Sequence, residues 1–332
     1  MSLDNIPTIY IACLAILIGF VGLIWAADRF VAGAAAFALN FGLAPMIIGL
    51  TVVSFGTSAP EILVSLNAAL ANSGDIAIGN ALGSNIANIG LVLAATALVA
   101  RIPVHKHVLI DEMPVLLIVT ALAGVFLFDG QLKRWEGWIL LLLLVPLIMY
   151  MVYTKRRDLS PEEQKQEEDI TPMPMGMACF WFLLGLIVLI GSSKILVWGA
   201  QTTAEFFEVS PLIIGLTVLA IGTSLPELAA SVVSALKGHH DIALGNIIGS
   251  NIFNLLAVMS LPGIIAPLSL EQAVFSRDYL VVAGLTIVLF AAIAFALIRN
   301  KQHQASMGRV VGALLLTSYT AYIYVLYLSS AN

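Results

Sequence analysis

The chain has 332 residues, of which 60% are hydrophobic and only 11% are charged, and its formal net charge is −5. Soluble domains carry about 25% charged residues, so this composition excludes an ordinary soluble protein and predicts one that crosses a lipid bilayer many times. The charges are too few and too scattered to indicate a nucleic-acid partner. The two cysteines, Cys13 and Cys179, lie in apolar runs without metal-binding or disulfide spacing.

Apolar runs of membrane-spanning length recur along the chain. The first follows the sequence MSLDN, which lacks the basic segment of a cleavable signal, so we expect it to be retained as the first helix. The polar, charge-dense stretch 154–174 separates two sets of runs and is expected to be a solvated loop. The predicted helices are 7–35, 44–71, 75–99, 108–128 and 134–154 before this loop, and 175–204, 211–236, 241–266, 279–298 and 308–328 after it.

The two sets of helices are copies of each other. The segment PMIIGLTVVSFGTSAPE at 45–61 aligns with PLIIGLTVLAIGTSLPE at 211–227, and DIAIGNALGSNIAN at 75–88 aligns with DIALGNIIGSNIFN at 241–254. The offset is constant, because 227 − 61 and 254 − 88 both equal 166. We therefore predict an all-α membrane protein of about ten transmembrane helices, with a first five-helix repeat at 1–154, a loop at 155–174 and a second five-helix repeat at 175–332.

An odd number of helices in each repeat turns the second repeat upside down in the membrane. Most Lys and Arg residues then fall on one side, whereas Lys133, Arg134 and Arg277 fall on the other. The positive-inside rule predicts a multi-pass protein of the cytoplasmic (inner) membrane, with the central loop in the cytoplasm and both termini outside. Inverted repeats are typical of secondary transporters, whose substrate site lies between the repeats near the membrane midplane.

Two carboxylates occupy equivalent places in the duplicated motifs. Glu61 follows Pro60, and Glu227 follows Pro226, in the middle of otherwise apolar segments. A carboxylate at membrane depth is costly and indicates a functional site. The inverted symmetry would bring the two side chains face to face, where they repel unless one is protonated or a cation lies between them. Calcium fits this setting, because it takes about 6–8 oxygen ligands.

The surrounding residues can supply those oxygens. Proline lacks a backbone donor and clashes with the carbonyl four residues back, so we expect exposed carbonyls near 54–57 and 220–223. Simpler interpretations exist for several of the polar groups. Ser and Thr hydroxyls in membrane helices often bond to their own helix, Asn can join two helices, and a buried Glu can be protonated and hydrogen-bonded. The glycines of Gly79-x-x-x-Gly83 and Gly245-x-x-x-Gly249 match a helix-packing motif.

The motifs GTSAPE…GNALGSNIAN and GTSLPE…GNIIGSNIFN resemble the two alpha repeats of the cation/calcium antiporter superfamily, and most closely its prokaryotic sodium/calcium exchanger branch. The resemblance covers the whole chain. It implies that Glu61 and Glu227 are the central calcium ligands and are also contacted by sodium. It also implies ion-site roles for the side chains of Thr57, Ser58, Ser84, Asn88, Thr223, Ser224, Ser250 and Asn254, and for the backbone carbonyls of Ser54 and Ala220.

Three features distinguish branches of this superfamily. The last motif ends in GSNIFN, whereas potassium-dependent exchangers end it in GSNIFD, so Asn254 replaces a carboxylate and potassium co-transport is not expected. The central loop is too short for the calcium-sensing domains of animal exchangers. Repeats of the GNAAEH kind, typical of the proton-coupled branch, do not occur in the sequence, which favours sodium coupling.

We therefore predict a secondary antiporter that exchanges sodium for calcium by alternating access, most simply for calcium extrusion. No cofactor is expected, because the ions are the transported substrates. A proton-coupled calcium or cation antiporter is the alternative within transport. An ion channel would pass calcium without sodium on the other side. An intramembrane hydrolase is disfavoured, because the motifs contain no His and no rhomboid-like Gly-x-Ser-Gly; we expect no enzyme activity.

Overall fold

The computed structural model describes residues 6–155, 171–207, 220–299 and 305–330, and these form a bundle of helices. Within these ranges, eight helices are long and apolar enough to cross a membrane, and the bent pair Pro45–Thr57 and Ala59–Leu70 makes a ninth span. The predicted helix 211–236 and the predicted loop 155–174 fall partly outside the described residues. The predicted fold class, an all-helical membrane protein, is confirmed.

The first half of the chain contains one unbroken long helix, a broken segment, a central helix and two outer helices. Short π-helical turns, labelled η, interrupt three of the helices. The elements are α1 Ile6–Phe41, α2 Pro45–Ile48, η2 Gly49–Val53, α3 Ser54–Thr57, α4 Ala59–Leu70, α5 Gly74–Ala87, η3 Asn88–Leu93, α6 Ala94–Val99, β1 Ile102–Pro103, η4 Val108–Glu112, α7 Met113–Leu127, β2 Gln131–Leu132 and α8 Arg134–Lys155.

The second half repeats this order. Four of its elements, α12, α13, α14 and β3, have the bounds of α3, α4, α5 and β1 shifted by 166 residues, the offset of the sequence repeat. The elements are α10 Met175–Phe206, α12 Ala220–Thr223, α13 Leu225–Leu236, α14 His240–Phe253, η6 Asn254–Val258, α15 Ser260–Ile265, β3 Leu268–Ser269, η7 Val274–Tyr279, α16 Leu280–Arg299, β4 Ser306–Met307 and α17 Arg309–Ser330.

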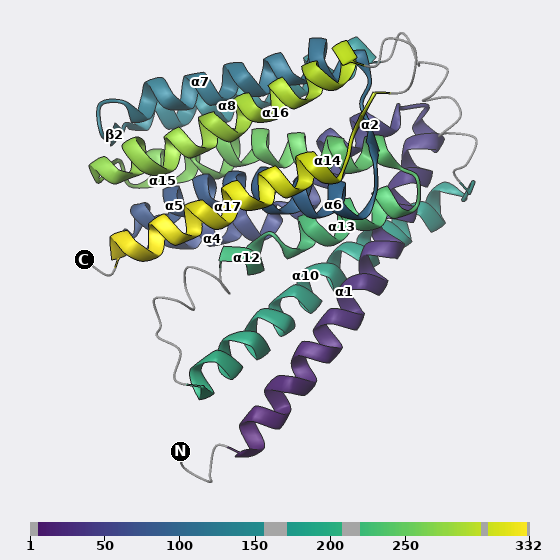
Figure 1. The fold of residues 1–332 in the computed structure, drawn as a ribbon, viewed down its shortest axis with the longest axis horizontal. Helices are drawn as coiled ribbons and strands as arrows, with labels where there is room; N and C mark the ends of the chain where they lie inside the picture. The colour runs from purple at the N-terminus through teal and green to yellow at the C-terminus, as the bar shows by residue number, and fades with distance from the viewer. Residues whose placement is uncertain (1–5, 156–170, 208–219, 300–304, 331–332) are drawn as a thin grey trace.

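Two small antiparallel ribbons show how the halves are oriented. Strand β1 pairs with β4, and β2 pairs with β3, so the repeat-related strands β1 and β3 belong to different ribbons. Figure 1 shows β2 at one end of the long helices and the short yellow strand β4 at the other. A duplication whose copies point in opposite directions produces this pairing, whereas copies pointing the same way would place β1 and β3 at the same end.

Helices α1 and α10 pack along each other and lean away from the rest of the bundle (Figure 1). Glycines permit the close approach. A Cβ added at Gly33 would lie 2.4 Å from the Phe182 nitrogen, and one added at Gly199 would lie 2.6 Å from the Ala12 carbonyl oxygen. These two glycines are also separated by the repeat offset of 166 residues. The pair therefore forms a tightly packed unit at the side of the core.

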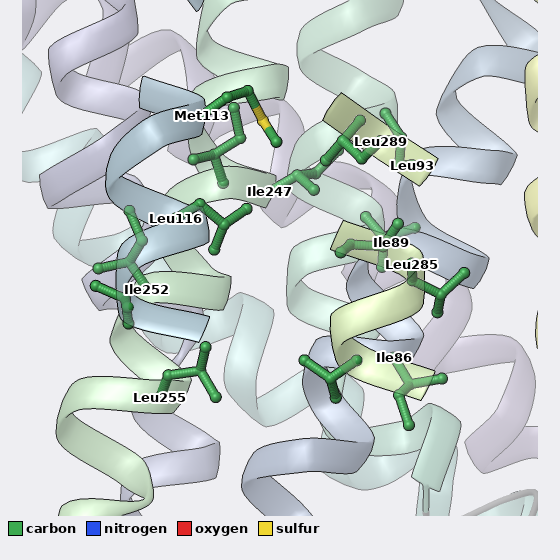
Figure 2. Packing of buried hydrophobic residues seen from close by; sticks show 14 of the residues in the cluster. Ile86, Ile89, Leu93, Met113, Leu116, Ile247, Ile252, Leu255, Leu285 and Leu289 are labelled. Atoms are coloured by element: carbon green, nitrogen blue, oxygen red, sulfur yellow. The ribbon is translucent and has the colours of Figure 1, made fainter. Parts of the chain in front are cut away.

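The core is centred on α5 and α14, the two helices that carry the Asn- and Ser-rich motifs. Over one 18-residue stretch of each span, all residues of His240–Ile265 and 72% of those of Gly74–Val99 are buried, compared with 22–28% in the spans that contain α1, α8, α10, α16 and α17. Figure 2 shows the apolar side chains around them, including Ile86, Ile89, Ile247, Ile252 and Leu255. The predicted packing role is confirmed for Gly245 and Gly249, because a Cβ there would lie 2.7 Å from Met46 O or 2.5 Å from Leu50 O, but not for Gly79 and Gly83, where a Cβ would meet no described atom within 4 Å.

Candidate cation site

The site begins with two equivalent helix breaks. Helix α3 ends at Thr57, and α4 begins at Ala59 after a bend of 45°. Ser58, at the break, has ψ of 3°, far from the helical value, and its counterpart Ser224 has ψ of 7°. Each new helix has proline in its first turn, where the missing backbone donor is tolerated.

Glu61 and Glu227 lie in the first turns of α4 and α13, where the helix dipole favours negative charge. Both side chains are fully buried, and the two carboxyls lie near each other. The Ser58 hydroxyl donates to Glu227 Oε1 at 3.2 Å, across the repeat interface. Among the described residues, Glu61 Oε1, Glu61 Oε2 and Glu227 Oε2 have no hydrogen-bond partner. Two buried carboxyls in this arrangement need a proton or a cation to compensate their charge.

Asn88 and Asn254 lie at the start of the π-helical turns η3 and η6. Such turns bulge from a helix and are frequent at functional sites. Both side chains are buried, and neither amide has a hydrogen-bond partner in the described parts of the chain. One helical turn earlier, Ser84 lies close to the Glu61 carboxyl, and the buried Ser250 hydroxyl is also without a hydrogen-bond partner there.

A second layer of polar residues holds the breaks in place. Asn80 donates to the Glu61 carbonyl and to the Ser65 hydroxyl, each at 3.1 Å. In the second half, Asn246 donates to the Ser231 hydroxyl at 2.9 Å and to the Glu227 carbonyl at 3.4 Å. Ser65 and Ser231 are not among the predicted site residues. Their position four residues after each Glu, in both repeats, was a signal that could have identified them.

The remaining predicted ligands differ in their surroundings. The Thr57 hydroxyl is within reach of Asn246 Oδ1 at 3.0 Å and of the Ser54 carbonyl at 3.3 Å. The Ser54 carbonyl also accepts the Ser58 N–H at 2.9 Å. The sequence predicted an exposed carbonyl here because of Pro60, but this oxygen keeps its hydrogen-bond partners. Thr223 is half-buried next to the second break, and Ala220 is the first residue of α12.

The carbonyl that Pro226 leaves without a helical donor has found another one. Proline cannot donate to the carbonyl four residues back, which in the second half belongs to Gly222. The Ser193 hydroxyl of α10 donates to this oxygen at 3.0 Å. At the equivalent place in α1, 166 residues earlier, stands Ala27, which has no hydroxyl. Helix α10 thus donates a hydrogen bond to the second break, whereas α1 has no hydroxyl at the equivalent position to do the same at the first break.

A hollow of about 400 Å³ adjoins the breaks between α4, α10 and α12. Pro60, Ser193, Gly222 and Thr223 are among its lining residues, so it reaches the residue before Glu61 and the end of α12 at the second break. Lys194, in the middle of α10, lies on its wall.

The buried side chains predicted as ligands all offer oxygen atoms. They are two carboxyls, the Ser58, Ser84, Ser224 and Ser250 hydroxyls, and the Asn88 and Asn254 amides, which come from the two breaks and from the helices α5 and α14 with their π-helical turns. Oxygen ligands of this kind suit hard cations such as calcium. The described residues contain no group of three or more His, Cys, Asp or Glu that could hold a metal ion, so a site for a softer metal is not found there.

A helical membrane bundle with two similar halves, each broken beside a buried carboxyl, is typical of ion transporters. Comparison with known proteins identifies the family. The family described as sodium/calcium exchanger protein matches residues 11–153 and 177–328. The chain therefore belongs to the sodium/calcium exchanger family, and it is a cation/calcium antiporter rather than an enzyme.

Three known proteins match this chain along almost their whole length. The putative antiporter CaxA of Alkalimonas amylolytica is 46% identical, over 96% of this chain and 99% of that protein. The inner membrane protein YrbG of Escherichia coli is 39% identical, over 96% and 97%. A structure of the sodium-calcium exchanger NCX_Mj, soaked with sodium and calcium, has a TM-score of 0.79 at 29% identity and covers 94% of this chain and 97% of that one. The predicted resemblance is confirmed.

Proposed function

We propose that the protein exchanges sodium for calcium across the cytoplasmic membrane and extrudes calcium. The observation that carries this proposal is the pair Glu61 and Glu227, fully buried at two related helix breaks, with three of their four carboxyl oxygens lacking a hydrogen-bond partner in the described chain. A divalent cation between them would compensate both charges. The relative CaxA is named an antiporter and NCX_Mj a sodium-calcium exchanger, which supports the same substrates here.

Calcium and sodium would compete for overlapping oxygens. Calcium needs high negative charge in its ligand set, so it requires both glutamates ionised. Sodium carries half the charge and can be held by hydroxyls, amides and carbonyls with fewer charged ligands. We assign Glu61 and Glu227 to calcium and sodium. The other ligands are the side chains of Thr57, Ser58, Ser84, Asn88, Thr223, Ser224, Ser250 and Asn254, with the carbonyls of Ser54 and Ala220.

Alternating access would come from movement of α1 and α10 against the core. The two helices pack on each other through Gly33 and Gly199 and lean away from the other helices, so they can move as a pair (Figure 1). The Ser193 hydroxyl links α10 to the Gly222 carbonyl beside the site. A shift of α10 would change the oxygens available to the ion, which couples access to binding.

The orientation in the membrane follows from the basic residues. We place the loop 155–174 in the cytoplasm, between repeats 1–154 and 175–332, and both termini outside. The name of the relative YrbG, an inner membrane protein, supports the location. Alkaline phosphatase is active only outside the cytoplasm, so a fusion at Asn332 should be active and one at Lys165 inactive; the reverse result would overturn the orientation.

Calcium-45 uptake into proteoliposomes tests the exchange, with sodium, potassium and pH gradients imposed separately. An outward sodium gradient should drive uptake, and Glu61→Gln and Glu227→Gln should each abolish it, while Asp75→Asn, an exposed carboxylate on α5, should not. Unimpaired uptake in either Gln variant would refute the assigned site. Uptake driven by a pH gradient without sodium would establish the alternative, a proton-coupled antiporter, and uptake without any counter-ion would indicate a channel.

A further inference from the structure

Three arginines surround a hollow of about 790 Å³ at the end of the molecule where β1 pairs with β4. Arg101 follows α6, Arg299 ends α16, and Arg309 begins α17. All three side chains are exposed and line the hollow. They come from positions far apart in the sequence, so only the fold brings them together.

The β1–β4 ribbon sets this spacing. Ile102 pairs with Met307, and the Val104 N–H donates to the Ala305 carbonyl at 2.7 Å. These contacts fix the start of α17 next to the end of α6, which holds Arg309 and Arg101 on the same rim. Backbone hydrogen bonds between the two strands therefore fix the positions of Arg101 and Arg309 relative to each other.

Among the residues that the structure describes, no carboxylate lies within salt-bridge distance of Arg101, Arg299 or Arg309. Guanidinium groups bind phosphate in a two-pronged geometry, with more donors than an ammonium group offers. Three of them around one hollow suit a ligand that carries a phosphate.

Most of the remaining lining residues are apolar, and three of them are exposed. Val99 is 53% exposed, Phe295 63% and Val310 76%. Ala97 and Ala292 also line the hollow, and their small side chains leave space in it. In a membrane-spanning bundle such exposed apolar groups contact lipid chains. A ligand with an anionic head and an apolar tail would satisfy both parts of the lining.

The opposite end of the molecule provides the contrast. Its hollow, of about 390 Å³ beside the β2–β3 ribbon, is lined by Asp129, Glu271, Phe128 and Phe275 and contains no Lys or Arg. The two hollows thus lie at opposite ends of the molecule, the first lined by three guanidinium groups and the second by two carboxylates, of which Asp129 pairs with Lys133. The positive one lies on the side that the basic residues assign to the cytoplasm, where anionic lipids attract basic pockets between helices.

From these features, we infer that the hollow between α6, α16 and α17 is a binding site for an anionic phospholipid, with its headgroup phosphate held by Arg101, Arg299 and Arg309. The acyl chains would lie along Val99, Phe295 and Val310. The site is separate from the helix breaks, so the inference does not depend on which ion the protein exchanges.

Native mass spectrometry of the full-length protein in detergent tests this site, with phosphatidylglycerol and phosphatidylcholine of identical chains offered together. The wild type should retain phosphatidylglycerol preferentially. Each arginine should contribute about fivefold, so the triple variant Arg101→Gln/Arg299→Gln/Arg309→Gln should lose the preference. Arg134→Gln is the matched control, because Arg134 begins α8 as Arg309 begins α17, but at the other end; its preference should be unchanged.

Should the triple variant not fold, the three single Gln variants carry the test, and each should lower the preference. Equal retention of the two lipids by the wild type, or an unchanged preference in all arginine variants, would overturn the inference. Displacement of phosphatidylglycerol by millimolar inorganic phosphate would overturn the assignment to lipid, because the ligand would then be the free anion.

Discussion

The two halves of the site are nearly identical in sequence but differ in their hydrogen bonds. Ser58 donates to the carboxyl of Glu227, whereas its counterpart Ser224 has a hydroxyl without a partner among the described residues, and the oxygens of Glu61 are likewise without one. Ser193 donates to the Gly222 carbonyl, and Ala27 stands in its place in the first half. A transporter with opposed repeats must be asymmetric in any one state, because the site cannot open to both sides together. The hydrogen bonds of Ser58 and Ser193, and their absence at Ser224 and Ala27, therefore describe one conformational state of the transporter.

The largest difference in stability between the two halves should come from Asn80 and Asn246, which hold the two breaks in place. Asn246 contacts Thr57, Ser231 and the Glu227 carbonyl, whereas Asn80 contacts only Ser65 and the Glu61 carbonyl within the described chain. Leaving a buried polar group without its partner costs about 1–3 kcal/mol. Asn246→Ala should therefore lower the thermal midpoint in detergent clearly more than Asn80→Ala does. Equal losses would mean that the additional contact to Thr57 adds nothing.

The two break serines should separate stability from ion binding. Ser58→Ala removes a hydrogen bond to a buried carboxyl, worth about 1.5–3 kcal/mol, so it should lower the thermal midpoint without calcium and raise the calcium KM. Ser224→Ala removes a hydroxyl with no such bond and should raise the calcium KM about tenfold while leaving the calcium-free midpoint unchanged. Thermal melts and calcium-45 uptake measure both quantities. If Ser224→Ala left the KM unaltered, that hydroxyl would not be a ligand.

Most of the fold could be predicted from the sequence because the chain is duplicated. The constant offset between repeats places the bounds of α12, α13 and α14 where those of α3, α4 and α5 predict them. The buried positions of Glu61 and Glu227 also follow from the motif, since a carboxylate in an apolar segment must face the protein interior.

Other features could not be predicted, for physical reasons. The π-helical turns at Asn88 and Asn254 have no pattern of their own, because one additional residue per turn leaves the apolar run unchanged. The hydrogen bond from Ser58 and its absence at Ser224 follow nearly identical motifs, GTSAPE and GTSLPE, so the motif alone does not predict which serine makes it. The arginine hollow depends on the β1–β4 pairing, which joins residues about 200 positions apart.

A smaller effect is expected at the contact between α10 and the second break. We expect the Gly222 carbonyl, one residue before the assigned ligand Thr223, to contact sodium as well. Ser193 would then compete with the ion for this oxygen, and Ser193→Ala should make it more available. One neutral hydrogen bond is worth about 0.5–1.5 kcal/mol, so the sodium KM should fall about two- to tenfold. Ser192→Ala is the control, because Ser192 faces Gly22 of α1 instead. A higher sodium KM in Ser193→Ala would show that Ser193 orients the carbonyl for the ion.

The smallest effect is expected at the acidic end of the molecule, where Lys133 donates to Asp129 in the exposed turn between α7 and α8. This hydrogen bond lowers the pKa of the Asp129 carboxyl and raises the pKa of the Lys133 ammonium. The stabilisation from Asp129 is present above its unfolded pKa of about 4 and is lost as the pH falls through the lower folded value. The stabilisation from Lys133 is complete below its unfolded pKa of about 10.4 and is lost as the pH rises through the higher folded value.

Asp129→Asn should therefore lower the thermal midpoint slightly and by the same amount between about pH 5 and 9, and high salt should reduce the difference. A difference that changed with pH inside this window would mean that Asp129 interacts with a group other than Lys133.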